Sequence, residues 1–130
     1  MAQEVTAISG SSAWFERGFV TYSNDAKQEL LGVRAETLSR HGAVSEEAAR
    51  EMALGALGRS KGTISLAVTG IAGPAGGSAG KPVGMVCFAW ARRGGAVRSV
   101  TEHFKGDRES VRRQSVVRAL EGVFASLDAR

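Results

Sequence analysis

The chain has 130 residues, of which 43% are hydrophobic and 23% are charged, and this is the size and composition of one globular domain. The longest apolar stretch, Val83 to Ala91, is far shorter than the roughly 20 residues of a membrane-spanning helix, so we expect no membrane partner. Glu4 interrupts the N-terminus before a secretory signal can form, which predicts a cytoplasmic protein. Cys87 has no partner cysteine and is predicted to be a buried thiol.

The net charge of +4 comes from the C-terminal part of the chain. Residues 92–130 hold nine Lys and Arg against five Asp and Glu, whereas residues 1–91 are balanced. Such an excess can attract nucleic acid or a small phosphorylated ligand. The arginines alternate with acidic residues, and no aromatic platform accompanies them, so a nucleic-acid partner is disfavoured.

The first elements in chain order are a strand and a helix. Residues Gly18 to Tyr22 (GFVTY) are β-branched and aromatic, which favours a short buried strand. Ser23 or Asn24 can then cap a helix that ends at Gly32.

A second helix and three strands follow. The helix begins at Ser45 and ends near Gly58, because its apolar residues recur at helical spacing. Thr63 to Thr69 and the nearly unbroken apolar run Val83 to Ala91 are typical of strands covered on both faces. A turn at residues 92–96 leads to a strand from about 97 to 104.

Asp107 can cap a long last helix after Gly106. Its large apolar residues form one stripe at helical spacing, which we expect to face the core: Val116, Val117, Leu120, Val123, Phe124 and Leu127. Together the elements predict an α/β fold in which helices flank a sheet.

The loop Gly70 to Pro82 (GIAGPAGGSAGKP) is the strongest local signal of function. Its five glycines permit positive φ and omit Cβ atoms, so backbone amides can converge on a phosphate or an oxyanion. It is not a Walker loop, because Pro82 follows Gly80-Lys81 where that motif needs Ser or Thr. The alternative is a mobile connection between two strands, although so long a loop in a compact chain is more often functional.

The segment Thr21 to Lys27 (TYSNDAK) is the second candidate. Tyr22 ends the expected strand and Lys27 lies in the first turns of the next helix, so both side chains can reach one pocket. A lysine acts as a general base at neutral pH only if its pKa falls well below about 10.4, through desolvation or a positive field. The alternative places Tyr22 in the core, Asn24 as a cap and Lys27 in solvent.

Other nucleophile and metal patterns are weak. Ser9, Ser11 and Ser12 lie in no G-x-S-x-G elbow, and the histidines His41 and His103 stand in no triad order. No cluster of ligands has metal spacing, so we expect no metal.

Five segments taken together resemble the C-terminal domain of the CinA family, whose stand-alone members are nicotinamide-nucleotide amidases of the PncC type. They are GSSAWFERGFVTYSNDAKQELLGV (Gly10 to Val33), HGAVSEEAA (His41 to Ala49), VTGIAGPAGG (Val68 to Gly77), KPVG (Lys81 to Gly84) and GDRESVRRQ (Gly106 to Gln114). The resemblance extends over almost the whole chain. It implies one three-layer domain over residues 1–130, with a central mixed β-sheet flanked by helices.

The resemblance also implies a reaction, which is hydrolysis of the carboxamide of nicotinamide mononucleotide to nicotinic acid mononucleotide and ammonia. It implies that this reaction needs no cofactor or metal and belongs to pyridine-nucleotide salvage. Lys27 matches the family's general base, and Tyr22 matches a tyrosine that assists it. Substrate binding falls to Asn24 and to loop residues Gly70, Ile71, Ala72, Gly73, Gly76 and Gly77. From charge alone, Arg108, Arg112 and Arg113 can help to attract the phosphate.

One departure from the family concerns the nucleophile. The family places its serine in an N-terminal Glu-Ser-Cys-Thr-Gly-Gly motif, which these 130 residues do not contain, so we expect an N-terminally truncated domain without the family's first helix and strand. The alternatives are an amidase whose site is incomplete because the chain is truncated or its start is misplaced, an inactive relative that binds a nucleotide or a protein, and an assembly in which another chain supplies the motif. The resemblance further suggests a homodimer.

Overall fold

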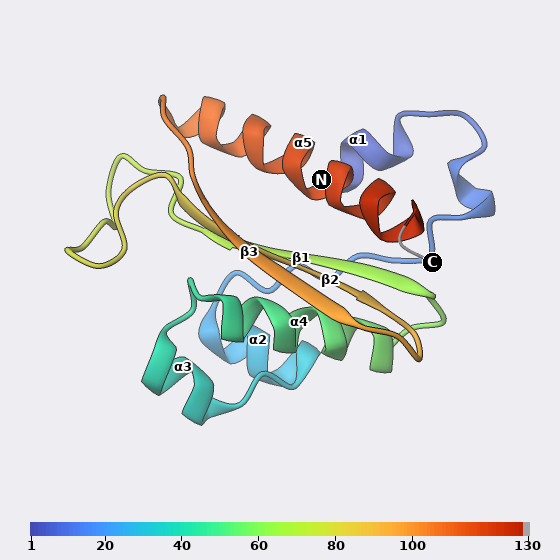
Figure 1. The fold of residues 1–130 in the computed structure, drawn as a ribbon, viewed down its shortest axis with the longest axis horizontal. Coiled ribbons are helices and arrows are strands. Elements are labelled where there is room, and N and C mark those ends of the chain that lie inside the picture. The colour runs from blue at the N-terminus through green and yellow to red at the C-terminus, as the bar shows by residue number, and fades with distance from the viewer. Residues whose placement is uncertain (129–130) are drawn as a thin grey trace.

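A three-stranded sheet lies between two helical layers in the computed structural model, which describes residues 1–128 (Figure 1). Helix α4 covers one face of the sheet, with α2 and α3 packed against it on that side, and α5 covers the other face. The elements in chain order are α1 (Ala2–Thr6), the 3-10 helix η1 (Ser11–Ala13), α2 (Asn24–Leu31), α3 (Ala35–His41), α4 (Glu46–Gly58), β1 (Ile64–Gly70), β2 (Met85–Arg92), β3 (Val97–His103) and α5 (Arg108–Asp128). The predicted three-layer α/β arrangement is confirmed.

The strand order is β1-β2-β3, and both pairings are antiparallel. Ala67 pairs with Ala89, and Phe88 pairs with Val100. The described part of the sheet is therefore not the mixed sheet that the resemblance implied. Loops without a crossover helix join β1 to β2 and β2 to β3, and such direct connections give antiparallel neighbours.

The helix boundaries follow the predicted caps. Ser23 Oγ accepts a hydrogen bond from the Ala26 amide at 3.0 Å, and Ser45 Oγ accepts one from the Ala48 amide at 3.1 Å. Asp107 Oδ1 accepts one from the Ser110 amide at 2.9 Å. These bonds satisfy amides that a helix start leaves without partners, so α2, α4 and α5 begin where the sequence predicted.

The core on the α4 side of the sheet is built from small residues. Cys87, Ala89 and Ala91 of β2 face α4, where Ala49 and Ala53 are fully buried. Small side chains on both surfaces let the helix lie close to the sheet. Cys87 is fully buried, as predicted.

The core on the α5 side is built around large β2 residues, and the predicted α5 stripe is correct only in part, since Val123 packs against this core. Trp90 is buried and donates from Nε1 to the Ala119 carbonyl at 2.8 Å. A Cβ atom on Gly122 would lie 2.0 Å from the Trp90 ring, so only a small residue fits there. The helix buries a face of mostly small residues, namely Val111, Ser115, Ala119, Gly122 and Ser126, whereas Val117 and Phe124 are exposed.

The predicted buried strand Gly18 to Tyr22 is also wrong. Within the described residues this segment pairs with no strand, and Val20 and Tyr22 are 86% and 91% exposed. β-branched and aromatic residues favour a strand only where a neighbouring strand and a packed face receive them.

Candidate functional site

The first part of the site is the start of α2, where Lys27 points inward. Lys27 is only 6% exposed, and its Nζ donates to the Thr21 carbonyl oxygen at 2.7 Å. That carbonyl belongs to the extended segment before the helix, so the capped turn at Ser23 folds the chain back over the lysine. Among residues 1–128, Lys27 forms no salt bridge with a carboxylate.

Burial lowers the pKa of Lys27 below its ordinary value of 10.5, because the charged form loses hydration. A carboxylate partner would raise this pKa again, and the structure supplies only a carbonyl dipole. The fraction of neutral amine near pH 7 is therefore larger than for a lysine in solvent. A neutral amine can accept a proton, which is what a general base must do.

Helix α4 fixes the position of the helix that carries Lys27. Leu31, the last residue of α2, is buried, and its carbonyl accepts a hydrogen bond from Arg59 Nη1 at 3.3 Å. A Cβ atom on Gly55 of α4 would lie 1.9 Å from the same carbonyl oxygen. The glycine therefore permits a close approach of α4 to the end of α2, and this approach sets the place of Lys27.

The structure does not bury the other two predicted residues of this segment. Tyr22 is exposed. It directly follows Thr21, whose carbonyl oxygen accepts the hydrogen bond from Lys27. Asn24 is the first residue of α2 and is exposed, while Ser23 and not Asn24 is the cap. Only Lys27 of the three is held inside the fold.

The second part of the site is the loop of residues 71–84, between β1 and β2. Backbone hydrogen bonds close its base, from the Ile71 amide to the Met85 carbonyl at 2.9 Å and from the Gly84 amide to the Ile71 carbonyl at 2.7 Å. Gly73 has a φ of +85°, and a Cβ atom there would lie 2.4 Å from Val83 Cγ1. The loop therefore needs glycine at this position both for its backbone conformation and for the contact with Val83.

The remaining predicted loop residues lie at different depths. Gly73 is buried and Ile71 and Ala72 are half-buried, whereas Gly70, Gly76 and Gly77 are exposed. Gly76 also has a positive φ, of +103°. The loop thus presents exposed glycine backbone above a fixed base.

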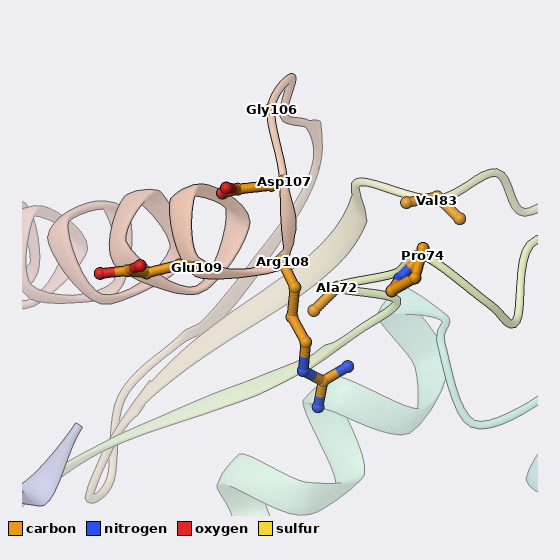
Figure 2. Close-up of a pocket in the computed structure, with 7 residues that line it drawn as sticks. All are labelled: Ala72, Pro74, Val83, Gly106, Asp107, Arg108 and Glu109. Atoms are coloured by element: carbon orange, nitrogen blue, oxygen red, sulfur yellow. The ribbon is translucent and has the colours of Figure 1, made fainter.

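A cavity of about 500 Å³ separates this loop from the start of α5 (Figure 2). The loop contributes Ala72, Pro74 and Val83 to its lining, and the chain at the start of α5 contributes residues 106–109. Figure 2 shows the Arg108 side chain extending toward the loop, where Nη1 donates to the Gly73 carbonyl at 3.0 Å. The carboxylates of Asp107 and Glu109 point away from the loop in the same view.

Of the three arginines proposed from charge, only Arg108 lines this cavity. Arg112 is exposed, and Arg113 forms an exposed pair with Glu109 at 2.9 Å along the helix. Sequence reasoning could not separate the three, because charge is the same at each position. The position at the first turn of α5 distinguishes Arg108.

The lysine and the cavity are separate features in the described residues. Neither Lys27 nor Tyr22 lines the cavity. Ser11 is buried, Ser9 and Ser12 are exposed, and none of the three hydroxyls forms a hydrogen bond with Lys27. Residues 1–128 contain no group of three or more His, Cys, Asp or Glu side chains that could hold a metal ion.

Lys81 is a residue that the sequence analysis did not select. Its ammonium donates to the carbonyls of His41 and Val44, in the turn between α3 and α4. The only signal for it was its place in the KPVG segment.

Within residues 1–128, every helix is too short or too polar to cross a bilayer.

Comparisons with known proteins agree with this architecture. Residues 1–127 match the sequence profile of the family described as the CinA C-terminal domain. The chain is 54% identical over 121 residues to "Nicotinamide-nucleotide amidohydrolase PncC" of Enterobacter agglomerans, and the match covers 93% of this chain and 74% of that protein. It is 49% identical over 123 residues to the protein of the same name from Pseudomonas putida, with 95% and 76% covered.

A solved structure is also similar. The competence/damage inducible protein CihA from Agrobacterium tumefaciens superposes with a TM-score of 0.92 at 50% sequence identity. The superposition covers 95% of this chain and 76% of that one.

Proposed function

Because this chain belongs to the CinA C-terminal domain family, we propose that it is a nicotinamide-nucleotide amidohydrolase and that residues 1–130 form one domain. The reaction converts nicotinamide mononucleotide and water into nicotinic acid mononucleotide and ammonia. It needs a base that takes a proton from the attacking oxygen and returns it to the leaving NH2 group. The observation that carries the proposal is the buried Lys27, whose hydrogen-bond partner among the described residues is a carbonyl and not a carboxylate.

In this proposal Lys27 is the general base and Tyr22 assists it. Desolvation lowers the pKa of Lys27, so the neutral amine is available at lower pH than for a solvated lysine. Tyr22 is adjacent to the Thr21 carbonyl that orients the amine, and its exposed phenol can reach a bound substrate. Asn24 lies exposed at the start of the same helix and would contact the substrate from there.

The glycine loop and Arg108 would bind the nucleotide. Exposed backbone at Gly70, Gly76 and Gly77 offers amides to a phosphate or an oxyanion, while Ile71, Ala72 and Gly73 form the fixed base of the loop. Arg108 brings a positive charge to the cavity beside this loop. We propose that the reaction uses no cofactor and no metal.

A second candidate is a relative that binds the nucleotide or a protein without catalysis. It is favoured by the surroundings of Lys27, since no hydroxyl within residues 1–128 forms a hydrogen bond with its amine.

The two candidates are separated by measuring ammonia release and nucleotide binding on the same purified chain. Turnover of nicotinamide mononucleotide that disappears in Lys27→Met and persists in Lys61→Met supports the amidohydrolase. Lys61 is a suitable control because it is an exposed lysine. Calorimetric binding of the nucleotide without turnover supports the second candidate. Neither binding nor turnover by folded protein contradicts the amidohydrolase and the nucleotide-binding relative, and leaves only a relative that binds a protein.

We propose further that the protein is a homodimer. Its exposed apolar side chains support this, since Trp14 and Phe124 are 64% and 67% exposed and Ile8 is 65% exposed. Large exposed apolar residues are often contact sites between proteins. Sedimentation equilibrium of the chain checks the mass, and a monomer at micromolar concentration contradicts the proposal.

We propose a cytoplasmic location and a role in pyridine-nucleotide salvage. The support is chemical, because the proposed substrate and product are phosphorylated nucleotides that do not cross membranes unaided. Cell fractionation with a tagged chain checks the location.

A further inference from the structure

Lys81 connects the loop of residues 71–84 to the opposite helical layer. Its ammonium donates to the Val44 carbonyl at 2.8 Å and to the His41 carbonyl. His41 is the last residue of α3, and carbonyls at the end of a helix lack partners within the helix and carry partial negative charge. A lysine ammonium, with its three donors, can satisfy two such carbonyls at once.

The turn that receives Lys81 is itself fixed. Thr69 Oγ1, at the end of β1, donates to the Ala43 carbonyl at 2.8 Å, and Ser45 Oγ donates to the Gly42 carbonyl at 2.8 Å. Gly42 leaves the space for the ammonium, because a Cβ atom there would lie 2.6 Å from Lys81 Nζ. The turn therefore provides a preformed receptor for the lysine.

Beyond its base, the loop has few other attachments to the rest of residues 1–128. Arg108 holds the Gly73 carbonyl from the α5 side, and Ser78 and Lys81 pair with each other through two backbone hydrogen bonds of 2.9 and 3.1 Å. Residues 74–80 are all exposed, and the loop projects beyond the end of the sheet (Figure 1). The attachment at Lys81 therefore holds the outer half of the loop to the body of the protein.

We propose that Lys81 is a positioning residue, which fastens the 71–84 loop to the α3–α4 turn and so keeps the glycine backbone in its nucleotide-binding conformation. This inference rests on the proposed function. Lys81 does not act on the substrate, because both of its bonds are to carbonyls of the protein. When only a fraction of molecules holds the binding-competent conformation, the apparent dissociation constant rises by the inverse of that fraction.

The test compares Lys81→Met, Lys81→Arg and the control Lys61→Met in the full chain. Lys61 precedes β1 and lies at the opposite end of that strand from the loop. Hydrogen exchange at the amides of Ser78 and residue 81 reports the attachment of the loop. Calorimetric titration with nicotinamide mononucleotide and steady-state ammonia release report binding and turnover.

In Lys81→Met we expect exchange at both amides to be about tenfold faster, and Kd and KM to rise about tenfold with kcat changed less than about twofold. Lys81→Arg should recover part of the loss, because it keeps a cationic donor. Lys61→Met should match the wild type in every measurement.

Three results overturn the inference. They are unchanged exchange in Lys81→Met, faster exchange with unchanged nucleotide binding, and a fall in kcat with unchanged KM. Failure of the proposed function gives a different result, because the wild-type chain itself would then neither bind nor hydrolyse the nucleotide. The positioning role would fail with it, while the exchange data would still report whether Lys81 fastens the loop.

Discussion

The substitution Gly55→Ala tests whether the contact between α4 and α2 sets the place of Lys27. Gly55 lies in the last turn of α4, and an added Cβ atom would stand 1.9 Å from the Leu31 carbonyl oxygen and 2.8 Å from the Leu31 carbonyl carbon. These are backbone atoms at the end of α2, so no side chain can rotate away to make room. Real Cβ atoms do not approach other heavy atoms closer than 3.0 Å, so the two helices must separate by about 1.1 Å.

Two opposing effects determine the change in the free energy of unfolding. Overpacking costs about 3 kcal/mol, at the upper end of the usual range, because the neighbour is backbone. Alanine in place of glycine inside a helix stabilises by about 1 kcal/mol. The net loss is about 2 kcal/mol, which for a domain of this size lowers the melting temperature by about 6–10 °C.

The displacement also moves Lys27, which α2 carries. In the proposed function Lys27 is the general base, and a shift of about 1 Å in such a group can reduce the rate by about 100-fold. On that proposal we expect kcat/KM for nicotinamide mononucleotide to fall by this factor at a temperature where the variant is folded. Circular dichroism gives the melting temperature and ammonia release gives the rate.

Gly58→Ala is the matched control, because it makes the same change on the same helix. A Cβ atom on Gly58 would meet nothing within 4 Å, so this variant should gain up to about 1 kcal/mol and keep its activity. If Gly55→Ala has the same melting temperature as Gly58→Ala and hydrolyses the nucleotide equally fast, the close approach of α4 to α2 does not position Lys27.

Three further predictions follow from single contacts. Burial lowers the pKa of Lys27, so between the folded value and about 10.5 the unfolded chain binds more protons at this group, and its contribution to the free energy of unfolding rises with pH. Denaturant titrations should show this rise as a difference between the wild type and Lys27→Met, because burial also raises the pKa of the Cys87 thiol and acts in the opposite direction in both proteins. Arg108→Met removes the charge beside the cavity, so KM should rise about tenfold in steady-state kinetics. Arg113→Met should leave KM unchanged, because Arg113 is exposed and pairs with Glu109 on its own helix. Gly122→Ala places a Cβ atom 2.0–2.4 Å from the Trp90 ring, so urea unfolding should show a loss of about 1–3 kcal/mol; an unchanged midpoint would mean that α5 can move away without cost.

Local signals predicted the elements because their causes are local. Ser23, Ser45 and Asp107 bond to amides only three residues ahead, so the starts of α2, α4 and α5 can be recognised without the rest of the chain. Gly18 to Tyr22 shows the limit, since its composition is that of a strand but no neighbouring strand in the described residues pairs with it. Strand formation depends on that distant partner, which composition does not reveal.

The candidate site divides in the same way. The sequence by itself determined the glycine loop and singled out Lys27 through its motif, because both are contiguous segments. Only the tertiary structure decided that Lys27 is buried against the Thr21 carbonyl, that Arg108 and not Arg113 faces the cavity, and that Lys81 crosses to the α3–α4 turn. The pKa of a lysine and the partners of a charge depend on which distant elements exclude water from it, and packing of the whole chain sets that exclusion.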